Sequence, residues 1–119
     1  MKNCVLCGKL GEKHHIVYKS QGGLDIPLNY IYLCFEHHRG INGPHKNRYV
    51  DKEYKLNLQE ELIRLLKKDY YDIEELKKIL NINPYQAKIV QINLNKYKLG
   101  YKKIEVIKRI MGGKIYVKK

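Results

Sequence analysis

The chain has 119 residues, 44% of them apolar, and its 24 Lys and Arg against 12 Asp and Glu give a formal net charge of +12. This length leaves room for one compact domain, or for a small domain with a helical appendage. The excess of positive charge favours a polyanionic partner, most plausibly nucleic acid, over an acidic small molecule.

The sequence also predicts where the protein works. No run of about 18 apolar residues is present, so we expect no membrane span. The segment Met1-Lys2-Asn3-Cys4 lacks the apolar stretch of a secretory signal. Three cysteines cannot all pair within one chain, and thiolate ligands suit a reducing compartment. We therefore expect a soluble, cytoplasmic protein.

Two short strands are predicted in the first third of the chain, over residues 12–19 and 29–35. Both segments contain β-branched and aromatic residues, and Gly22-Gly23 lies between them. The pattern indicates a hairpin with a long loop. Turn residues follow at Gly40, Gly43 and Pro44, so this segment can hold only a short helical turn.

The first long helix is predicted over residues 51–68, with Asp51 as its N-terminal cap. Leucines at helical spacing (Leu58, Leu62, Leu65) form its apolar face, which Ile63 and Leu66 widen. This pattern is typical of a core helix, and we assign it no chemistry.

Shorter elements are predicted in the remainder of the chain. Residues 72–75 have capping-box spacing and open a helix with Leu76, Ile79 and Leu80 inward. After a break at 81–83, a second helix opens at Asn83-Pro84 with an apolar stripe of Tyr85, Ile89 and Ile92. A third helix over 102–111, with an apolar face of Ile104, Ile107, Ile110 and Met111, ends at Gly112-Gly113. A short strand-like tail over 114–117 follows.

Cys4-x2-Cys7 and Cys34-x2-His37 have the spacing of two halves of a tetrahedral zinc knuckle. Each pair lets a tight turn present two ligands, and the intervening hairpin brings the second pair back to the first. Such a structural Zn²⁺ would stabilise a small core. The alternative is that the cysteines are ordinary buried small residues.

Four histidines remain: His14, His15, His38 and His45. His38 immediately follows a predicted zinc ligand, so the knuckle that holds Cys34 and His37 would also hold His38 beside the strand of His14-His15. A lone histidine is more often a surface or core residue than a ligand. Four of them in one segment indicate a second metal site.

The motif H-H-I-V, then Asn29 five residues before Cys34, then L-C-x-x-H-H, resembles the HNH endonucleases of the ββα-metal type with a zinc knuckle. The resemblance covers about residues 4–48. It implies an α+β fold with a ββα-metal core over 1–68, followed by a basic helical extension over 69–119. It also implies one catalytic divalent ion, Mg²⁺ or a transition metal, that serves phosphodiester hydrolysis in DNA. The compact form suggests a phage or mobile-element setting.

The same resemblance implies roles for single residues. His14 and His38 stand at metal ligands, His15 at the general base, and Asn29 at the residue that braces the hairpin. His37 replaces the last cysteine of the family's knuckle. His45 is either a third ligand of the catalytic ion or a surface histidine that contacts phosphate.

Basic residues in two regions are predicted to contact nucleic acid: Arg39, Lys46 and Arg48 near His45, and Lys102, Lys103, Lys108 and Arg109 near the C-terminus. Residues 95–119 contain nine Lys or Arg and one Glu, hence +8. The alternative for each is a solvated basic surface. The two capped helices over 72–94 resemble either a DNA-reading helix-turn-helix, with Gln86, Lys88, Gln91 and Asn93 exposed, or an ordinary helical hairpin.

Two rival functions are compatible with all or part of this residue pattern. A zinc-stapled DNA-binding protein without catalysis needs the knuckle but has no use for His14, His15 or Asn29. A nuclease for RNA or branched DNA would have the same centre and a different substrate.

Overall fold

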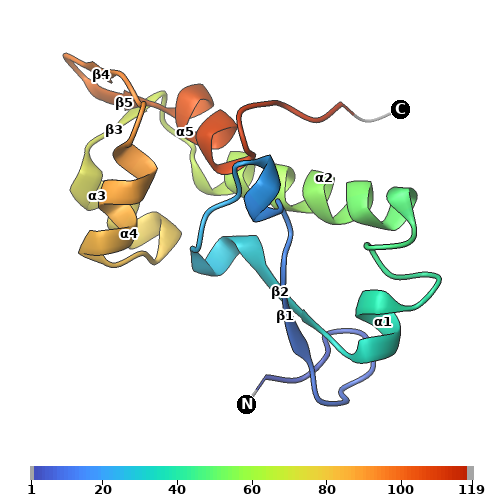
Figure 1. Cartoon of the computed structure of the whole chain (residues 1–119). Helices are drawn as coiled ribbons and strands as arrows, with labels where there is room; N and C mark the ends of the chain where they lie inside the picture. Colours follow the sequence, from blue (N-terminus) through green and yellow to red (C-terminus); the bar gives the residue numbers. More distant parts are fainter. Residues whose placement is uncertain (1, 118–119) are drawn as a thin grey trace.

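Strands β1 (Glu12–His15) and β2 (Tyr30–Leu33) form the predicted antiparallel hairpin, with His14 opposite Ile31 and His15 opposite Tyr30. The computed structural model describes residues 2–117 (Figure 1). The predicted strand over 12–19 ends at His15, because the chain then turns into a loop with two short 3-10 helices, η1 (Lys19–Gln21) and η2 (Pro27–Asn29). The short helix α1 (Phe35–Arg39) follows β2.

The long helix α2 (Arg48–Leu65) starts three residues earlier than predicted. Its cap is Asn47, whose side chain accepts from the backbone N–H groups of Tyr49 and Val50, so the prediction of Asp51 as the cap is wrong. Leu58, Leu62 and the C-terminal Leu66 are buried as predicted, whereas Ile63 is 50% exposed.

Helices α3 (Ile73–Leu80) and α4 (Pro84–Gln91) both open with a capping box, as the sequence predicts. The predicted apolar stripe of α4 is wrong at Tyr85 and Ile92, whereas Ile89 is half-buried against the main core. Tyr85 and Ile92 are 72% and 54% exposed, and Ala87 and Val90 are the residues of α4 that are buried.

A small sheet with the order β3-β5-β4 was not predicted: β3 (Tyr70–Tyr71), β4 (Lys96–Tyr97) and β5 (Gly100–Lys102). The last helix, α5 (Lys103–Ile110), buries Val106, Ile107 and Ile110, while Ile104 is 47% exposed, contrary to its predicted inward position. The predicted strand over 114–117 is absent from the described residues, because the backbone of Tyr116 pairs with the side chain of Gln59 instead of a strand.

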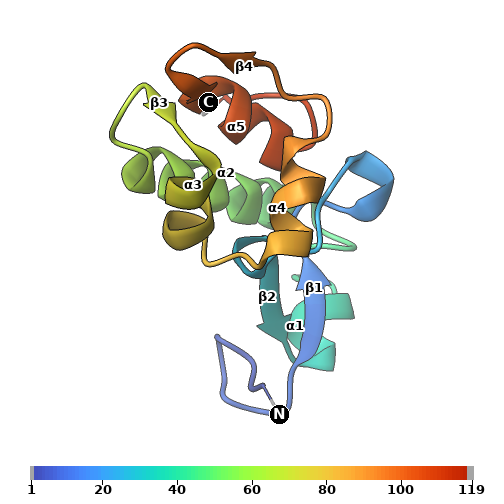
Figure 2. The ribbon, with the colours of Figure 1, turned by 90° about the vertical axis from the view of Figure 1, so that its left-hand side faces the viewer.

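The fold is α+β, with the β1–β2 hairpin and α1 on one side of the helices (Figure 2). The main core combines loop residues such as Val17 and Ile26 with Leu62 of α2, Leu76 of α3 and Ile107 of α5. It therefore crosses the expected boundary between residues 68 and 69. Leu33, Cys4 and Cys34 form a second, smaller core. Among residues 2–117, no helix has the length and apolar character to span a membrane.

Candidate metal centres

The first centre consists of Cys4, Cys7, Cys34 and His37, which the structure brings together as predicted. The N-terminal turn is closed by hydrogen bonds from Cys4 N to Lys9 O (2.7 Å) and from Gly8 N to Cys4 O (2.9 Å). Gly8 has a φ of +78°, a conformation that favours glycine. This turn presents two thiols to the N-terminus of α1.

The four side chains have the spacing of a tetrahedral metal site. The sulfurs of Cys7 and Cys34 are 3.7 Å apart, and His37 Nδ1 lies 3.4 Å from Cys4 Sγ and 3.3 Å from Cys34 Sγ. A Zn–S bond of about 2.3 Å places two tetrahedral sulfur ligands about 3.8 Å apart, and a sulfur and a nitrogen ligand slightly closer. The four groups could therefore hold one tetrahedral ion.

The environment of Cys4 also favours the thiolate, which is the form that binds metal. Burial raises the pKa of the Cys4 thiol, but backbone hydrogen bonds from Cys34, Leu6 and Cys7 and a hydrogen bond from the His37 side chain lower it to about 6. All three cysteines are free thiols.

The second centre consists of His14, His38 and His45. His38 Nε2 lies 3.1 Å from His14 Nδ1 and 2.7 Å from His45 Nε2. Two imidazole nitrogens bound to one ion at about 2.1 Å lie about 3.0 to 3.4 Å apart. The separation of His14 and His38 falls in this range, and that of His38 and His45 is about 0.3 Å shorter, so the three nitrogens converge on one point that a divalent ion could occupy. His45 is exposed on the pocket side, which leaves positions of such an ion open.

The loop from α1 to α2 delivers His45 to this cluster. Gly43 is buried in the loop, and a Cβ at this position would lie 2.5 Å from the backbone oxygen of His38. The close approach of the two backbones therefore requires glycine. It places His45 beside His38, although seven residues separate them in the sequence.

Burial favours the neutral, metal-binding form of these imidazoles. Desolvation, followed by repulsion from the charged forms of His38 and His45, lowers the pKa of His14 to about 3. Burial also lowers the pKa of His45, with repulsion from His38 next in importance. Both shifts favour the uncharged imidazole.

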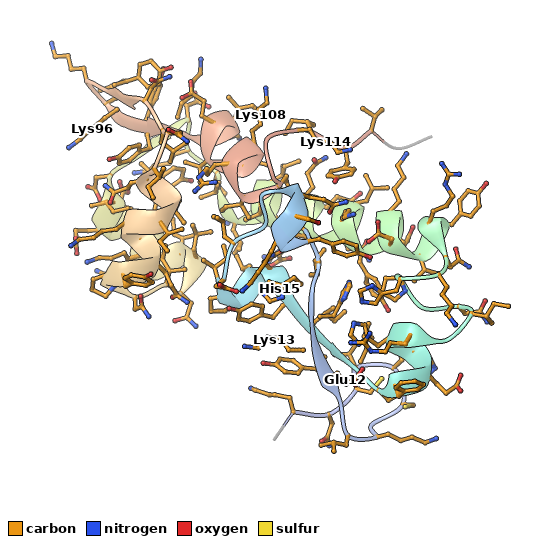
Figure 3. All side chains as sticks on the ribbon, in the orientation of Figure 1. Glu12, Lys13, His15, Lys96, Lys108 and Lys114 are labelled. Atoms are coloured by element: carbon orange, nitrogen blue, oxygen red, sulfur yellow. The ribbon has the colours of Figure 1, made fainter. Side chains whose placement is uncertain are left out.

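Glu12 orients His38 and was missed by the sequence analysis. Its Oε1 lies 2.7 Å from His38 Nδ1, so an N–H at that nitrogen leaves the lone pair of Nε2 facing His14 and His45. Figure 3 shows Glu12 on the side of β1 that faces α1 and Lys13 on the other side. The alternation of side chains along a strand places Glu12 on the same face as His14, a signal that the sequence contains.

His15 lies next to the second centre and contacts a different partner. Its Nε2 is 2.6 Å from Asp25 Oδ1, and its ring packs edge-on against Tyr30 at 5.2 Å. Because β1 ends at His15, both His14 and His15 line one open pocket of about 250 Å³. Lys13, Lys19 and Arg39 supply positive charge to the same pocket.

Asn29 is fully buried and holds the loop between β1 and β2. Its Oδ1 accepts from Val17 N (2.8 Å), and its Nδ2 donates to the backbone oxygens of Val17 and Leu24 (3.0 Å each). These are the backbone hydrogen bonds expected of the bracing residue. Asn29 does not line the pocket itself.

Tyr18, Lys55 and Asp51 form a polar cluster that contacts His14 and His45 through the Tyr18 ring. The Tyr18 ring stacks on His45 at 5.5 Å, and Lys55 Nζ lies 4.7 Å above the Tyr18 ring. Lys55 is 3% exposed and pairs with Asp51 at 2.6 Å. Burial, followed by the Asp51 carboxylate, raises the pKa of Tyr18 to about 12. This cluster was not predicted, although Asp51 and Lys55 have the i,i+4 spacing of a helical ion pair.

The predicted nucleic-acid residues have different environments. Arg39 lines the pocket and pairs with Glu12 at 3.4 Å, and Lys46 and Arg48 are exposed near His45. Lys102 and Lys108 are exposed, whereas Arg109 donates to the backbone oxygen of Ile89. Figure 3 shows Lys96, Lys108 and Lys114 well away from His15. Lys118 and Lys119, counted in the charge of this segment, lie outside the described residues.

Comparison with known protein families, with curated proteins and with solved structures found no match to this chain.

Proposed function

We propose that this protein is a metal-dependent endonuclease of the HNH type, with a ββα-metal core, that hydrolyses phosphodiester bonds in DNA. The observation that carries the proposal is that His15 opens on the same pocket as the cluster of His14, His38 and His45. A possible base and a possible ion site thus lie side by side, as hydrolysis of a phosphodiester requires.

In this proposal the knuckle is a structural zinc site and has no part in the chemistry. Successive residues on a helix point about 100° apart, so α1 directs His37 to the knuckle and His38 to the pocket. Metal in the knuckle would therefore fix the position of His38. This is the reason for two ions in so short a segment.

His14, His38 and His45 would hold the catalytic ion. That ion would neutralise charge on the phosphate and stabilise the leaving oxygen. Lys13, Lys19 and Arg39 would attract the phosphate backbone to the pocket.

His15 would accept a proton from the attacking water. With Nε2 directed at Asp25, its other nitrogen is the available base, and imidazole accepts protons at neutral pH. Asn29 would keep the loop behind His15 in place through its three backbone hydrogen bonds.

The test is cleavage of plasmid DNA by purified protein with Mg²⁺, Mn²⁺, Ni²⁺ or EDTA, beside the His15→Ala variant. We expect cleavage with at least one ion, none with EDTA, and loss of cleavage with retained DNA binding in the variant. A non-catalytic zinc-stapled DNA-binding protein would bind equally well and cut nothing in either form. Parallel assays on single strands, branched DNA and RNA identify the substrate class.

A further inference from the structure

We propose that Asp25 is a positioning residue for His15, and that Gln86 of helix α4 holds Asp25 in place. The C-terminal helices would thereby orient the base. This inference rests on the proposed function. It assigns the extension a role in catalysis that is separate from DNA contact.

The contact between His15 and Asp25 is short and directional. Asp25 Oδ1 lies 2.6 Å from His15 Nε2, and the Tyr30 hydroxyl donates to the same oxygen at 3.4 Å. The Tyr30 ring also packs edge-on against the imidazole, with an interplanar angle of 81°. His15 is thus held by contacts at its ring face and at one nitrogen.

A carboxylate can only accept a hydrogen bond, so it selects one tautomer of the neutral imidazole. With the proton on Nε2 facing Asp25, the lone pair is on Nδ1. A base needs this lone pair free to accept the proton of water, and a histidine with the opposite tautomer cannot act. Asp25 would therefore determine which nitrogen is basic.

The backbone of Asp25 is fixed from two sides. On one side, Asn29 donates to the backbone oxygen of the preceding Leu24. On the other, Gln86 Nε2 donates to the backbone oxygen of Asp25 at 2.9 Å, across 61 positions of sequence. The neighbouring Ile26 is 1% exposed in the main core. The loop is therefore anchored directly beside the carboxylate.

Gln86 serves two purposes at the start of α4. Its Oε1 accepts from Asn83 N at 3.0 Å and completes the capping box, while its Nε2 reaches Asp25. A glutamate at this position keeps the oxygen that the cap needs and loses the N–H that Asp25 needs. Gln86→Glu thus separates helix capping from loop anchoring.

The competing interpretation is an ordinary surface ion pair. The Asp25 side chain is 57% exposed and also lies 3.4 Å from Lys19 Nζ. In that case Asp25 would affect neither the His15 tautomer nor the rate. Lys19→Ala is the matched control for the tautomer alone, because it removes the other partner of Asp25 and leaves the contact with His15.

The first experiment measures the His15 tautomer by ¹⁵N NMR of the zinc-loaded full chain. We expect the Nε2–H form in the wild type and in Lys19→Ala. In Asp25→Asn, the amide can donate to Nε2, so we expect a shift towards the Nδ1–H form. The same tautomer in the wild type and in Asp25→Asn would overturn the proposal.

The second experiment measures kcat and DNA binding. A general base contributes about 10²- to 10⁴-fold, so we expect Asp25→Asn to lower kcat by about 10- to 100-fold with unchanged binding. In a His15→Ala background it should cause no further loss. Equal losses in both backgrounds would show a role that does not act through His15 and would overturn the proposal.

The third experiment tests the connection to α4. Gln86→Glu should retain the thermal stability of the wild type yet lower kcat, whereas Gln91→Glu, on the same helix but bonded to Tyr101, should leave kcat unchanged. Equal kcat in both variants would overturn the role of Gln86. A wild-type protein that cuts no DNA overturns the proposed function, and this failure is distinct from an unchanged tautomer.

Discussion

His37 and His38 are adjacent in α1, yet their imidazoles face two different clusters. His37 Nδ1 lies 3.3 Å from Cys34 Sγ, and His38 Nε2 lies 3.1 Å from His14 Nδ1. One helical turn therefore connects the two candidate metal centres, and a change at one ligand should affect the two centres differently.

Metal content should follow this division. We expect two ions per chain in the wild type, measured by mass spectrometry of dialysed protein. His38→Ala should lose the ion of the pocket and keep the zinc of the knuckle. Cys34→Ser should lose the knuckle zinc and lower the thermal stability, because a structural zinc contributes to folding. One ion or none in well-folded wild type would contradict two separate centres.

Glu12→Gln should weaken metal binding at the pocket. The carboxylate orients His38 through Nδ1, and loss of such a partner typically lowers metal affinity about 10- to 100-fold. Isothermal titration of Mn²⁺ measures the effect. The control is Glu36→Gln, which changes an exposed residue of α1, the helix that carries His38. This variant should bind Mn²⁺ as the wild type does.

Gly43→Ala should displace the loop that carries His45. The added methyl would lie 2.5 Å from the backbone oxygen of His38, and such overpacking typically costs about 1 to 3 kcal/mol. We expect weaker metal binding in the pocket and an unchanged knuckle. If the variant keeps both the metal affinity of the pocket and the stability of the wild type, the backbones of Gly43 and His38 approach each other less closely than 2.5 Å from Cβ to oxygen implies.

The buried pair of Lys55 and Asp51 should matter for stability. Asp51→Ala leaves an ammonium group buried without its partner, which typically costs about 3 to 5 kcal/mol in the free energy of unfolding. The exposed pair of Glu61 and Arg64, on the same helix, is the matched control. Glu61→Ala should cost far less than Asp51→Ala, because solvent screens an exposed ion pair. Similar losses in urea unfolding would contradict the buried position of Lys55.

Stability of the metal-free protein should decrease as the pH falls. The pKa of His14 is about 3 in the folded protein and about 6.5 when unfolded, so between these values the unfolded chain binds the extra proton. The free energy of unfolding then rises with pH, by at most about 1.4 kcal/mol per pH unit for one proton. His14→Gln should reduce this slope between pH 6.5 and pH 3 in urea unfolding. An unchanged slope would contradict the burial of His14.

Local signals in the sequence predicted much of this arrangement. The capping boxes at Asp72 and Asn83 depend on contacts three residues apart, and the spacing of Cys4 and Cys7 predicted that both thiols face one point. Such features depend on nearby residues and are readable without a fold.

Features that depend on tertiary packing were not predictable. The strands β3, β4 and β5 are two or three residues long, too short to show a period. Helix α4 buries Ala87 and Val90 and exposes Tyr85, because its contacts with α3 and α5 select the face. Asp25 meets His15 only through the folded loop, and no spacing in the sequence indicates that contact.

A joint titration shows whether an ion in the pocket of His14, His38 and His45 is required for DNA cleavage. Protein that holds zinc in the knuckle and no metal in the pocket is titrated with Mn²⁺, and both occupancy of the pocket and single-turnover cleavage of a DNA duplex are measured in each sample. We expect one Mn²⁺ at His14, His38 and His45, with a cleavage rate that rises in proportion to occupancy and vanishes in His38→Ala. Full occupancy without cleavage, or cleavage by protein with an empty pocket, would contradict catalysis by an ion at these three histidines.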